Sequence, residues 1–414
     1  MSGAGQPKPP ARGLPPVDPA TLRAALEAVP IGGMSAIRVR VPFRRPFATA
    51  TGMWLHREAW LILLNGAGPF AGRTGLGEAV LEPDATEVEE TILVRLIRET
   101  AAEAGTGALP YAEDLELLGT PGRAFRAAMD SARLDLAFAA DPTEVSVNGS
   151  IPFVAPDAAA EGARQAVEAG FDALKIKAGA ERETEDLVAR VRAVRRAVGP
   201  GVNLRLDVNG AWDLPTAEER LEAIARFGIE YVEQPLPADD FEGAAELRRL
   251  VRVPIAADEA VSTVSMARRI LEAGAADVLV VKPARVGGPV AVLEIAAAAR
   301  ARGVAVVIST LFETGVGIAA ARTCAALLAR ANAAAVGEGE DREDRDDDAI
   351  HAHGLATAGL LNHDLLAEPL PVDEGWMGLP DDPATETALA SGELGGLGVR
   401  LNLRAVAEFT AEAM

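Results

Sequence analysis

The hydrophobic pattern of the chain changes its period near residue 145. From Met34 to Val80, apolar and polar residues alternate between glycine turns, a pattern that predicts antiparallel strands. Two amphipathic stretches, near Glu87–Ala104 and Ala124–Ala139, then predict helices. Strands followed by helices favour an α+β module, which we assign to residues 31–144.

After the stretch VSVNGSIP, short apolar strands alternate with amphipathic helical segments. Polar residues end the strands at steps of 24 to 30 residues, about the length of one βα unit: Lys177, Asp207, Glu233, Asp258, Lys282 and Ser309. This repetition predicts an α/β fold, a modified (β/α)7β TIM-type barrel over residues 145–372. We expect VSVNG to be its first strand and a segment around Ala334–Leu355 its eighth.

The two ends of the chain do not extend these patterns. Residues 1–30 are rich in proline and glycine, and we expect an extension with one short helix at Thr21–Val29. The start contains no apolar segment typical of a signal peptide or a membrane span. Residues 373–414, which include GLGVRLNL, are predicted to pack back on the first module.

Composition narrows the classes of partner. A formal charge of −21 disfavours nucleic acid and anionic membranes as partners. Part of this charge lies in the acidic run Gly337–Asp348, which we interpret as a surface loop; a calcium site would need a different spacing of ligands. The single cysteine, Cys324, fits a reducing compartment, so we expect a cytoplasmic protein, and we expect a homo-oligomer.

Three successive predicted strands end in carboxylates: Asp207 in LRLDVNG, Glu233 in YVEQP and Asp258 in IAADEA. The carboxyl ends of barrel strands meet on one face, so these acids would repel one another without a cation between them. An all-oxygen set of this kind suits Mg²⁺, for which Mn²⁺ can substitute. The alternative is three unrelated surface acids.

Lysines precede and follow these acids along the chain. Lys175 and Lys177 stand two apart on one strand and so share a face, and Lys282 ends the later strand DVLVVK. Each could also be a solvated strand end. Beside a cation, repulsion and partial desolvation would lower a lysine pKa toward neutrality, as a general base requires. Two lysines that flank a metal suit removal of a proton next to a carboxylate.

Taken in order, Lys-x-Lys, Asp-x-Asn, Glu-Gln-Pro, Asp-Glu and VKPARVGG resemble the enolase superfamily, specifically its muconate-lactonizing-enzyme-like subgroup. The resemblance covers nearly the whole chain after about residue 34, and VPFRRPFATATG and GEA look like the capping domain of that family. The resemblance implies that the catalytic lysines are Lys177, Lys282 and Lys175. It implies that the magnesium ligands are Asp207, Glu233 and Asp258, and that Asn209 and Glu259 orient the ligands and Lys282.

In this assignment Lys177 is the base and Lys175 tunes it. Lys282 would be either an acid or base on the opposite face or a cation over the intermediate. Capping-domain loops usually complete specificity in the family, and here these would be about Phe47–Leu55 and Arg73–Leu81. The candidate lining residues are Thr49, Thr51, Met53 and Trp54.

Within the subgroup, VVISTLFETGVGIAAA and HAHGLATAGLLNHDL look like o-succinylbenzoate synthases, in which small residues and backbone amides hold the succinyl carboxylate. Arg205, two before the first metal aspartate, also agrees with their pattern. The likeness implies that Arg205 contacts the substrate or supports a residue that does, and that Ser309 and Thr310 bind the succinyl end. Alternatively, Arg205 makes a structural salt bridge and the two hydroxyl residues cap the next helix.

The reaction implied is the magnesium-assisted syn dehydration of 2-succinyl-6-hydroxy-2,4-cyclohexadiene-1-carboxylate through a metal-stabilised enediolate, a step of menaquinone biosynthesis. The nearest alternative is an N-succinylamino acid racemase. A muconate cycloisomerase or a dipeptide epimerase ranks below, since HAHGLATAGLLNHDL lacks the Asp-x-Asp that epimerases commonly carry. A non-catalytic ligand-binding barrel is disfavoured because an unused cluster of acids is costly to keep. His351 and His353 resemble a chelating pair, but solvated loop residues are the simpler interpretation.

Overall fold

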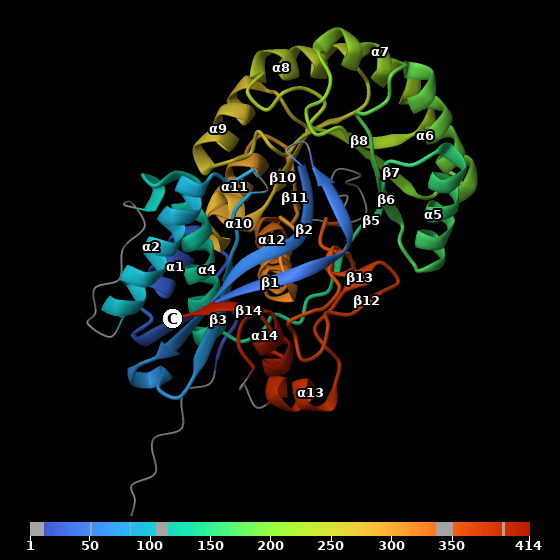
Figure 1. Cartoon of the computed structure of the whole chain (residues 1–414). Coiled ribbons are helices and arrows are strands. Elements are labelled where there is room, and N and C mark those ends of the chain that lie inside the picture. Colours follow the sequence, from blue (N-terminus) through green and yellow to red (C-terminus); the bar gives the residue numbers. More distant parts are fainter. Residues whose placement is uncertain (1–11, 50–51, 83, 105–114, 337–350, 391–393) are drawn as a thin grey trace, which may run out of the picture.

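A four-stranded antiparallel sheet forms the centre of the cap in the computed structural model (Figure 1), which describes residues 12–49, 52–82, 84–104, 115–336, 351–390 and 394–414. The strand order is β14-β1-β2-β3. The strands are β1 (Ile31–Thr49), β2 (Gly52–Gly66), β3 (Thr74–Ala79) and β14 (Thr410–Ala413). The C-terminal strand therefore joins the N-terminal sheet by pairing with β1.

Two long helices cover one face of this sheet: α2 (Glu87–Glu103) and α4 (Gly119–Ala137). Both helices and the three N-terminal strands occur where the sequence predicts them. Glycines let α4 approach β3 closely, because a Cβ on Gly77 would lie 2.0 Å from the carbonyl oxygen of Ala128. The alternation of β3 thus turns Gly75, Gly77 and Ala79 toward α4 and leaves Glu78 on the opposite face.

The second layer is a seven-stranded parallel sheet that curls inside a ring of helices (Figure 1). Its order is β11-β10-β9-β8-β7-β6-β5, so neighbours in sequence are neighbours in space. The strands are β5 (Gly149–Ile151), β6 (Ala173–Lys177), β7 (Asn203–Asp207), β8 (Ile229–Glu233), β9 (Ile255–Ala257), β10 (Val278–Val281) and β11 (Ala305–Ile308). The helices are α5 (Pro156–Glu168), α6 (Thr184–Val198), α7 (Leu214–Ile224), α8 (Phe241–Leu250), α9 (Val264–Ala273), α10 (Pro283–Val286), α11 (Pro289–Arg300) and α12 (Gly315–Val336).

Two isolated parallel bridges occupy the eighth position of the barrel. Val147 pairs with His353 on one side and Ser309 with Gly354 on the other, so this short segment lies between the first and last strands of the sheet. The predicted extent of the eighth strand is therefore wrong at its start, because Ala334 belongs to α12. The acidic run Gly337–Asp348 lies outside the described residues. Fold class, a barrel with an α+β cap, is as predicted.

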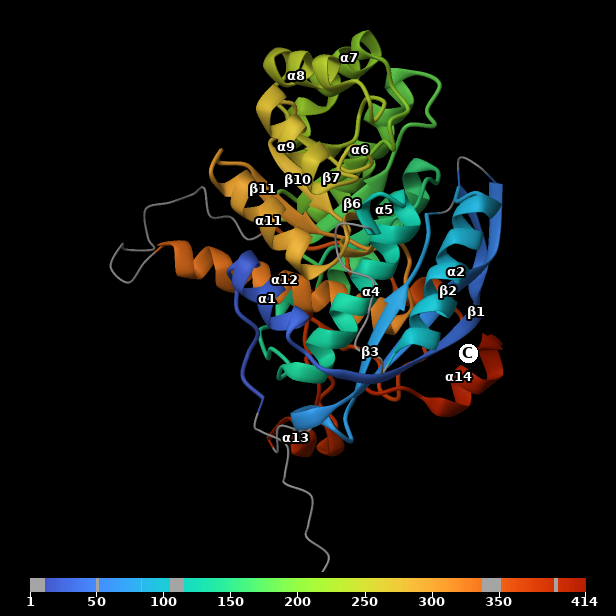
Figure 2. The same ribbon diagram turned by 90° about the vertical axis from the view of Figure 1, so that its left-hand side faces the viewer.

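The remaining elements join the two layers. Helix α1 (Pro19–Glu27) begins two residues before the predicted helix because Asp18 caps it, accepting from the amide of Thr21 at 2.8 Å. It lies beside α11 (Figure 2). Strands β4 (Val145–Ser146), β12 (Val372–Asp373) and β13 (Trp376–Met377) form a small sheet, and α13 (Pro383–Ala390) and α14 (Leu403–Phe409) precede β14. No described helix has the length and apolar character needed to cross a membrane.

Candidate active site

The ends of β6, β7 and β8 bring the predicted acids and lysines side by side. Lys177 stands opposite Asp207 in the parallel ladder, and Asp207 stands opposite Glu233. Asp258 follows the next strand, β9, directly. Each of the three acids is only 1% exposed, so their carboxylates lie inside the barrel rather than on separate surfaces.

Lysine ammonium groups lie between these carboxylates. The Nζ atom of Lys175 is 3.1 Å from Asp207 Oδ2 and 2.9 Å from Glu233 Oε1. The Nζ atom of Lys177 is 2.6 Å from the same oxygen of Asp207. Positive charge thus compensates acids that would otherwise repel one another.

Asp258 is held from two further directions. Lys282 Nζ lies 2.7 Å from Asp258 Oδ2, and Arg285 Nη1 donates to Asp258 Oδ1 at 2.8 Å. Arg285 also pairs with Glu82, which follows β3 of the cap. Sequence reasoning missed Arg285 and Glu82, although the KPAR tetrapeptide placed an arginine one helical turn after Lys282.

The pKa values follow from burial and from these pairs. Burial opposes ionisation of Asp207, but Lys175 and Lys177 outweigh it and lower its pKa to about 2. Burial, and next the charge of Asp207, raise the pKa of Glu233 to about 8. The lowering of a lysine pKa expected beside a cation stays a prediction: among the protein's own groups, burial lowers the pKa of Lys175, but the surrounding acids Asp207, Glu233 and Asp258 raise it well above its usual value.

The donor set fits a hard divalent cation in its chemistry. Three buried carboxylates converge, and the groups that compensate them here carry positive charge. Lysine ammonium groups lie against all three, however, and within the described ranges no group of three or more His, Cys, Asp or Glu side chains is spaced to hold a metal ion.

Asn209 and Glu259, predicted to orient the metal ligands and Lys282, are hydrogen-bonded to each other. Asn209 accepts from Lys177 Nζ at 3.1 Å and donates from Nδ2 to Glu259 Oε1 at 2.9 Å. Asn209 therefore orients Lys177, whereas the described hydrogen bond of Glu259 goes to Asn209 and not to Lys282. A further residue, Gln234, accepts from the backbone amides of Asp258 and Ala260 at 3.0 and 3.2 Å. Asn209 and Gln234 both have positive φ, a strained backbone common at functional sites.

Arg205 makes the structural salt bridge that was its alternative interpretation. The side chain is fully buried, and it donates to both carboxylate oxygens of Glu230, at 2.6 and 3.2 Å. It also donates to Asn148 Oδ1 and to the carbonyl of Ala352. A substrate has no access to a side chain in this position, so the predicted substrate contact of Arg205 is wrong.

His351 and His353, interpreted as solvated loop residues, both make hydrogen bonds to barrel residues, and for His353 that interpretation is wrong because the residue is only 6% exposed. His351 bonds to Glu230 Oε1 through Nδ1 at 2.6 Å. His353 is buried and its Nδ1 accepts from the amide of Ile308 at 3.0 Å, so its other nitrogen carries the proton. Burial lowers the pKa of His353 to about 3, which keeps the ring neutral. The two rings thus bond to different partners.

Ser309 and Thr310 lie at the end of β11 and are almost buried. The hydroxyl of Ser309 lies 3.4 Å from the carbonyl oxygen of Gly354, and that of Thr310 lies 3.1 Å from the hydroxyl of Thr357. The backbone amides expected to hold a succinyl carboxylate have partners nearby: those of Thr314 and Gly317 donate to Glu78, and that of Gly315 donates to Asp364.

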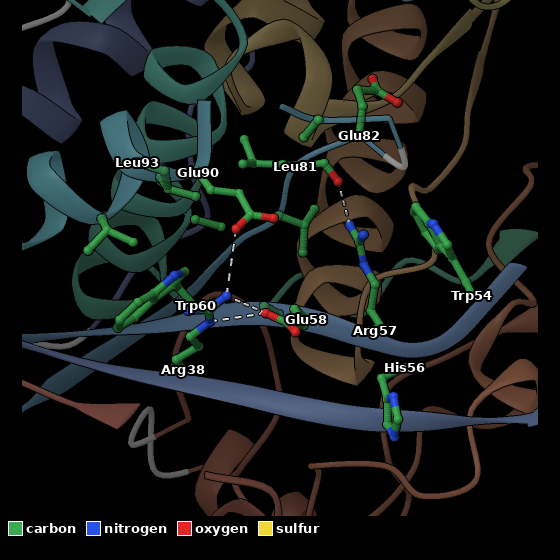
Figure 3. A pocket seen from close by; sticks show the side chains of 15 residues that line it. Arg38, Trp54, His56, Arg57, Glu58, Trp60, Leu81, Glu82, Glu90 and Leu93 are labelled. Atoms are coloured by element: carbon green, nitrogen blue, oxygen red, sulfur yellow. Dashed lines mark hydrogen bonds and ion pairs between the residues drawn. The ribbon is translucent and has the colours of Figure 1, made fainter. Parts of the chain in front are cut away.

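The cap residues predicted to line the mouth lie on the hairpin of β1 and β2. Trp54 borders a cavity of about 220 Å³ between β2 and the start of α2, where Arg57 donates to the carbonyl of Leu81 at 3.0 Å (Figure 3). Met53 is 61% exposed and Thr49 ends β1. Thr51 lies outside the described residues. The cavity also includes Glu82, the partner of Arg285, so it borders the residues that hold Asp258.

Residues 158–406 match the family model described as enolase C-terminal domain-like. The chain is also 31% identical over 396 residues to muconate cycloisomerase 1 of Rhodococcus opacus, which covers 89% of this chain and 95% of that protein. The chain belongs to the enolase superfamily. Within this superfamily of enzymes, its relatives assign it to the muconate-lactonizing-enzyme-like subgroup.

Other members of the enolase superfamily differ in the reaction their names describe. The chain is 38% identical over 251 residues to the o-succinylbenzoate synthase of Thermobifida fusca, covering 60% of this chain and 71% of that one. It is 30% identical over 310 residues to the L-Ala-D/L-Glu epimerase of Bacillus subtilis, covering 70% and 83%. A dipeptide epimerase of Cytophaga hutchinsonii, solved with Mg and a dipeptide, shares the fold with a TM-score of 0.72 and 19% identity over 93% of this chain and 99% of that one.

Proposed function

We propose that this protein is an o-succinylbenzoate synthase-like hydro-lyase. It would remove water from 2-succinyl-6-hydroxy-2,4-cyclohexadiene-1-carboxylate and release 2-succinylbenzoate, a step of menaquinone biosynthesis. A proton leaves the carbon next to the carboxylate, hydroxide leaves the adjacent carbon, and the ring becomes aromatic, which favours elimination. The observation that carries the proposal is the row of three buried carboxylates with lysines at both ends.

Lys177 is the side chain best suited to take the proton. Its side chain is 35% exposed, against 14% for Lys175 and 12% for Lys282, so a substrate could reach it most easily. Lys175 would keep Asp207 and Glu233 in place, and Asn209 would orient the ammonium group of Lys177. These contacts would fix the proton acceptor on one side of the substrate.

Asp207, Glu233 and Asp258 would hold Mg²⁺, with Mn²⁺ as a substitute. When bound, the ion would supply positive charge for the substrate carboxylate. Lys282, held on the far side by Asp258, would add a second positive charge. The support for this assignment is the chemistry of the three carboxylates. Positively charged ammonium groups already lie against them, as a positively charged metal ion would.

Among known relatives, the 38% identity to the Thermobifida fusca synthase supports the choice of substrate. The second candidate is an N-succinylamino acid racemase, favoured by the position of Lys177 and Lys282 at opposite ends of the acid row. A dipeptide epimerase ranks lower because the described part of the eighth barrel position, His351–Gly354, presents two histidines and no acid. The small-molecule carboxylate substrate, the homo-oligomer and the cytoplasmic location stay predictions.

The test is ultraviolet-monitored conversion of the cyclohexadiene substrate by purified protein with Mg²⁺, beside the same reaction after chelation with EDTA. We expect rapid conversion that EDTA abolishes. Lys177→Ala should lower kcat by about 10² to 10⁴, the usual contribution of a general base. Lys177→Arg keeps the positive charge but cannot act as a base, so it should be equally slow, while circular dichroism shows both variants folded.

Three results would overturn the proposal. Fast racemisation of N-succinylamino acids without dehydration would keep the site and replace the substrate. Conversion that persists after chelation would remove the metal from the mechanism, and an active Lys177→Arg variant would remove Lys177 as the base.

A further inference from the structure

The cap and the barrel meet in a buried carboxylate contact outside the acid row. Glu78 of β3 is 4% exposed and lies on the face of the cap sheet that packs on the barrel. Its Oε1 accepts from the amide of Thr314 at 3.0 Å, and its Oε2 accepts from the hydroxyl of Thr314 at 2.6 Å and from the amide of Gly317 at 2.8 Å. A cap residue thus satisfies the first turn of α12, a barrel helix.

The position of Glu78 is fixed from the opposite face of β3. A Cβ on Gly75 or Gly77 would lie 2.0 Å from the carbonyl oxygen of Ala132 or Ala128, so α4 packs directly on the backbone of β3. The amide of Leu76 also donates to Asp135 of α4 at 2.9 Å. Glu78 therefore extends from a strand with little freedom to shift.

The segment that Glu78 holds leads straight back to the barrel mouth. Ser309 and Thr310 directly follow β11 and precede Thr314 by only a few residues. Phe312 has a φ of 61°, a conformation rare outside glycine, and Glu313 accepts from the amide of Leu311. A strained loop of this kind keeps its shape only where the surrounding contacts determine it.

The absence of a side chain at Gly317 leaves room for Glu78 and Glu313 beside the first turn of α12. A Cβ at this position would lie 2.4 Å from Glu313 Cβ and 3.2 Å from Glu78 Oε2. Both acids are buried, and Arg57 is the buried cation whose charge acts on both of them. The contact is therefore a packed unit, and its loss would release the loop from the cap.

We propose that Glu78 is a positioning residue that sets the loop Ser309–Thr314 for substrate binding. It acts through Thr314 and Gly317, which donate hydrogen bonds to it, rather than through the acid row. The role rests on the proposed function, because this loop is where that function places the succinyl end of the substrate. The cap would thereby control substrate affinity through a strand that contacts the barrel at the start of α12.

Conservative variants of Thr314 test the proposal without disrupting the fold. Thr314→Val removes the hydroxyl that donates to Glu78 and nearly keeps the shape, whereas Thr314→Ser retains the hydroxyl. We expect Thr314→Val to raise KM about tenfold, equivalent to ~1.4 kcal/mol, with kcat within about twofold. Thr314→Ser should keep KM near that of the unchanged protein.

A matched control lies in α12, the helix that Thr314 directly precedes. Thr323 is buried and donates to the carbonyl of Ala319, so Thr323→Val loses a comparable hydrogen bond without touching Glu78. It should lower stability and leave KM unchanged. An unchanged KM in Thr314→Val, or an equal rise in Thr323→Val, overturns the proposal.

Hydrogen exchange separates this inference from the assignment of substrate. If the unchanged protein does not dehydrate the cyclohexadiene, the proposed function fails, and exchange then decides the positioning role alone. The amides of Leu311 and Gly317 should exchange about tenfold faster in Thr314→Val than in the unchanged protein, and not in Thr323→Val. Equal exchange in the two valine variants overturns the role of Glu78.

Discussion

Replacement of Arg205 by methionine should destabilise the barrel by about 3 to 5 kcal/mol, the usual cost of breaking a buried ion pair. The magnitude follows from the burial of its partner Glu230, whose side chain is only 15% exposed. Glu230 is the unpaired residue of a β-bulge in β8, where the register with β7 shifts. Burial opposes its ionisation, yet hydrogen bonds from His351 and Arg205 lower its pKa from 4.5 to about 2. At 1.36 kcal/mol for each pKa unit, ionised Glu230 contributes about 3 kcal/mol.

The pH dependence has a definite sign. Because the folded pKa lies below the unfolded one, this stabilisation is complete above about pH 4.5 and is lost as the pH falls toward about 2. Arg205→Met, which removes one of the two partners, should therefore differ most from the unchanged protein at neutral pH. The difference should shrink across the interval from 4.5 to 2.

The assay is urea unfolding followed by circular dichroism, as a double-mutant cycle with Glu230→Leu. Each single variant leaves one buried charge without its partner, whereas the double variant leaves neither. We expect the double variant to be at least about 1 kcal/mol more stable than Arg205→Met. A loss below about 1 kcal/mol for Arg205→Met, or additivity within about 0.5 kcal/mol, would refute the reasoning.

Two further predictions concern packing. Gly77→Ala should lower the free energy of unfolding by more than about 2 kcal/mol, because its Cβ would lie 2.0 Å from the carbonyl oxygen of Ala128. Gly162→Ala in α5, where the nearest neighbour of a Cβ is 3.8 Å away, should instead stabilise the protein by up to about 1 kcal/mol. Urea unfolding of both variants tests this, and equal effects would contradict the steric argument. Cys324 is buried, and burial raises the pKa of its thiol to about 12, so a thiol-reactive disulfide reagent should leave the folded protein unlabelled and react in urea; labelling without denaturant would show the site to be open.

Repetition along the chain was sufficient to predict the barrel. Strand ends at regular steps bring Lys177, Asp207, Glu233 and Asp258 together in any fold whose parallel strands follow one another in order, and the ladder pairs the first three directly. The face that each residue occupies follows from the two-residue period of a strand. The candidate site was therefore readable because its residues occupy equivalent places in a repeated unit.

Contacts that depend on how the barrel closes were not readable in this way. Arg205 is buried because a register shift turns Glu230 toward it, and a shift of one residue leaves no mark on the apolar pattern. The contact of His353 was not predictable for a similar reason. Its Nδ1 accepts from the amide of Ile308, in place of a backbone carbonyl, where the eighth strand consists only of isolated bridges.

The meeting of the two domains was likewise decided only by the tertiary structure. Glu82 is 203 residues from Arg285, and Glu78 is 236 residues from Thr314, so no local pattern links either pair. The sequence determined the repeated units and the chemistry at their ends, because both follow from periods of a few residues. The packing of the cap against the barrel determined which buried charges found partners, because such partners come from any part of the chain that reaches the same interior.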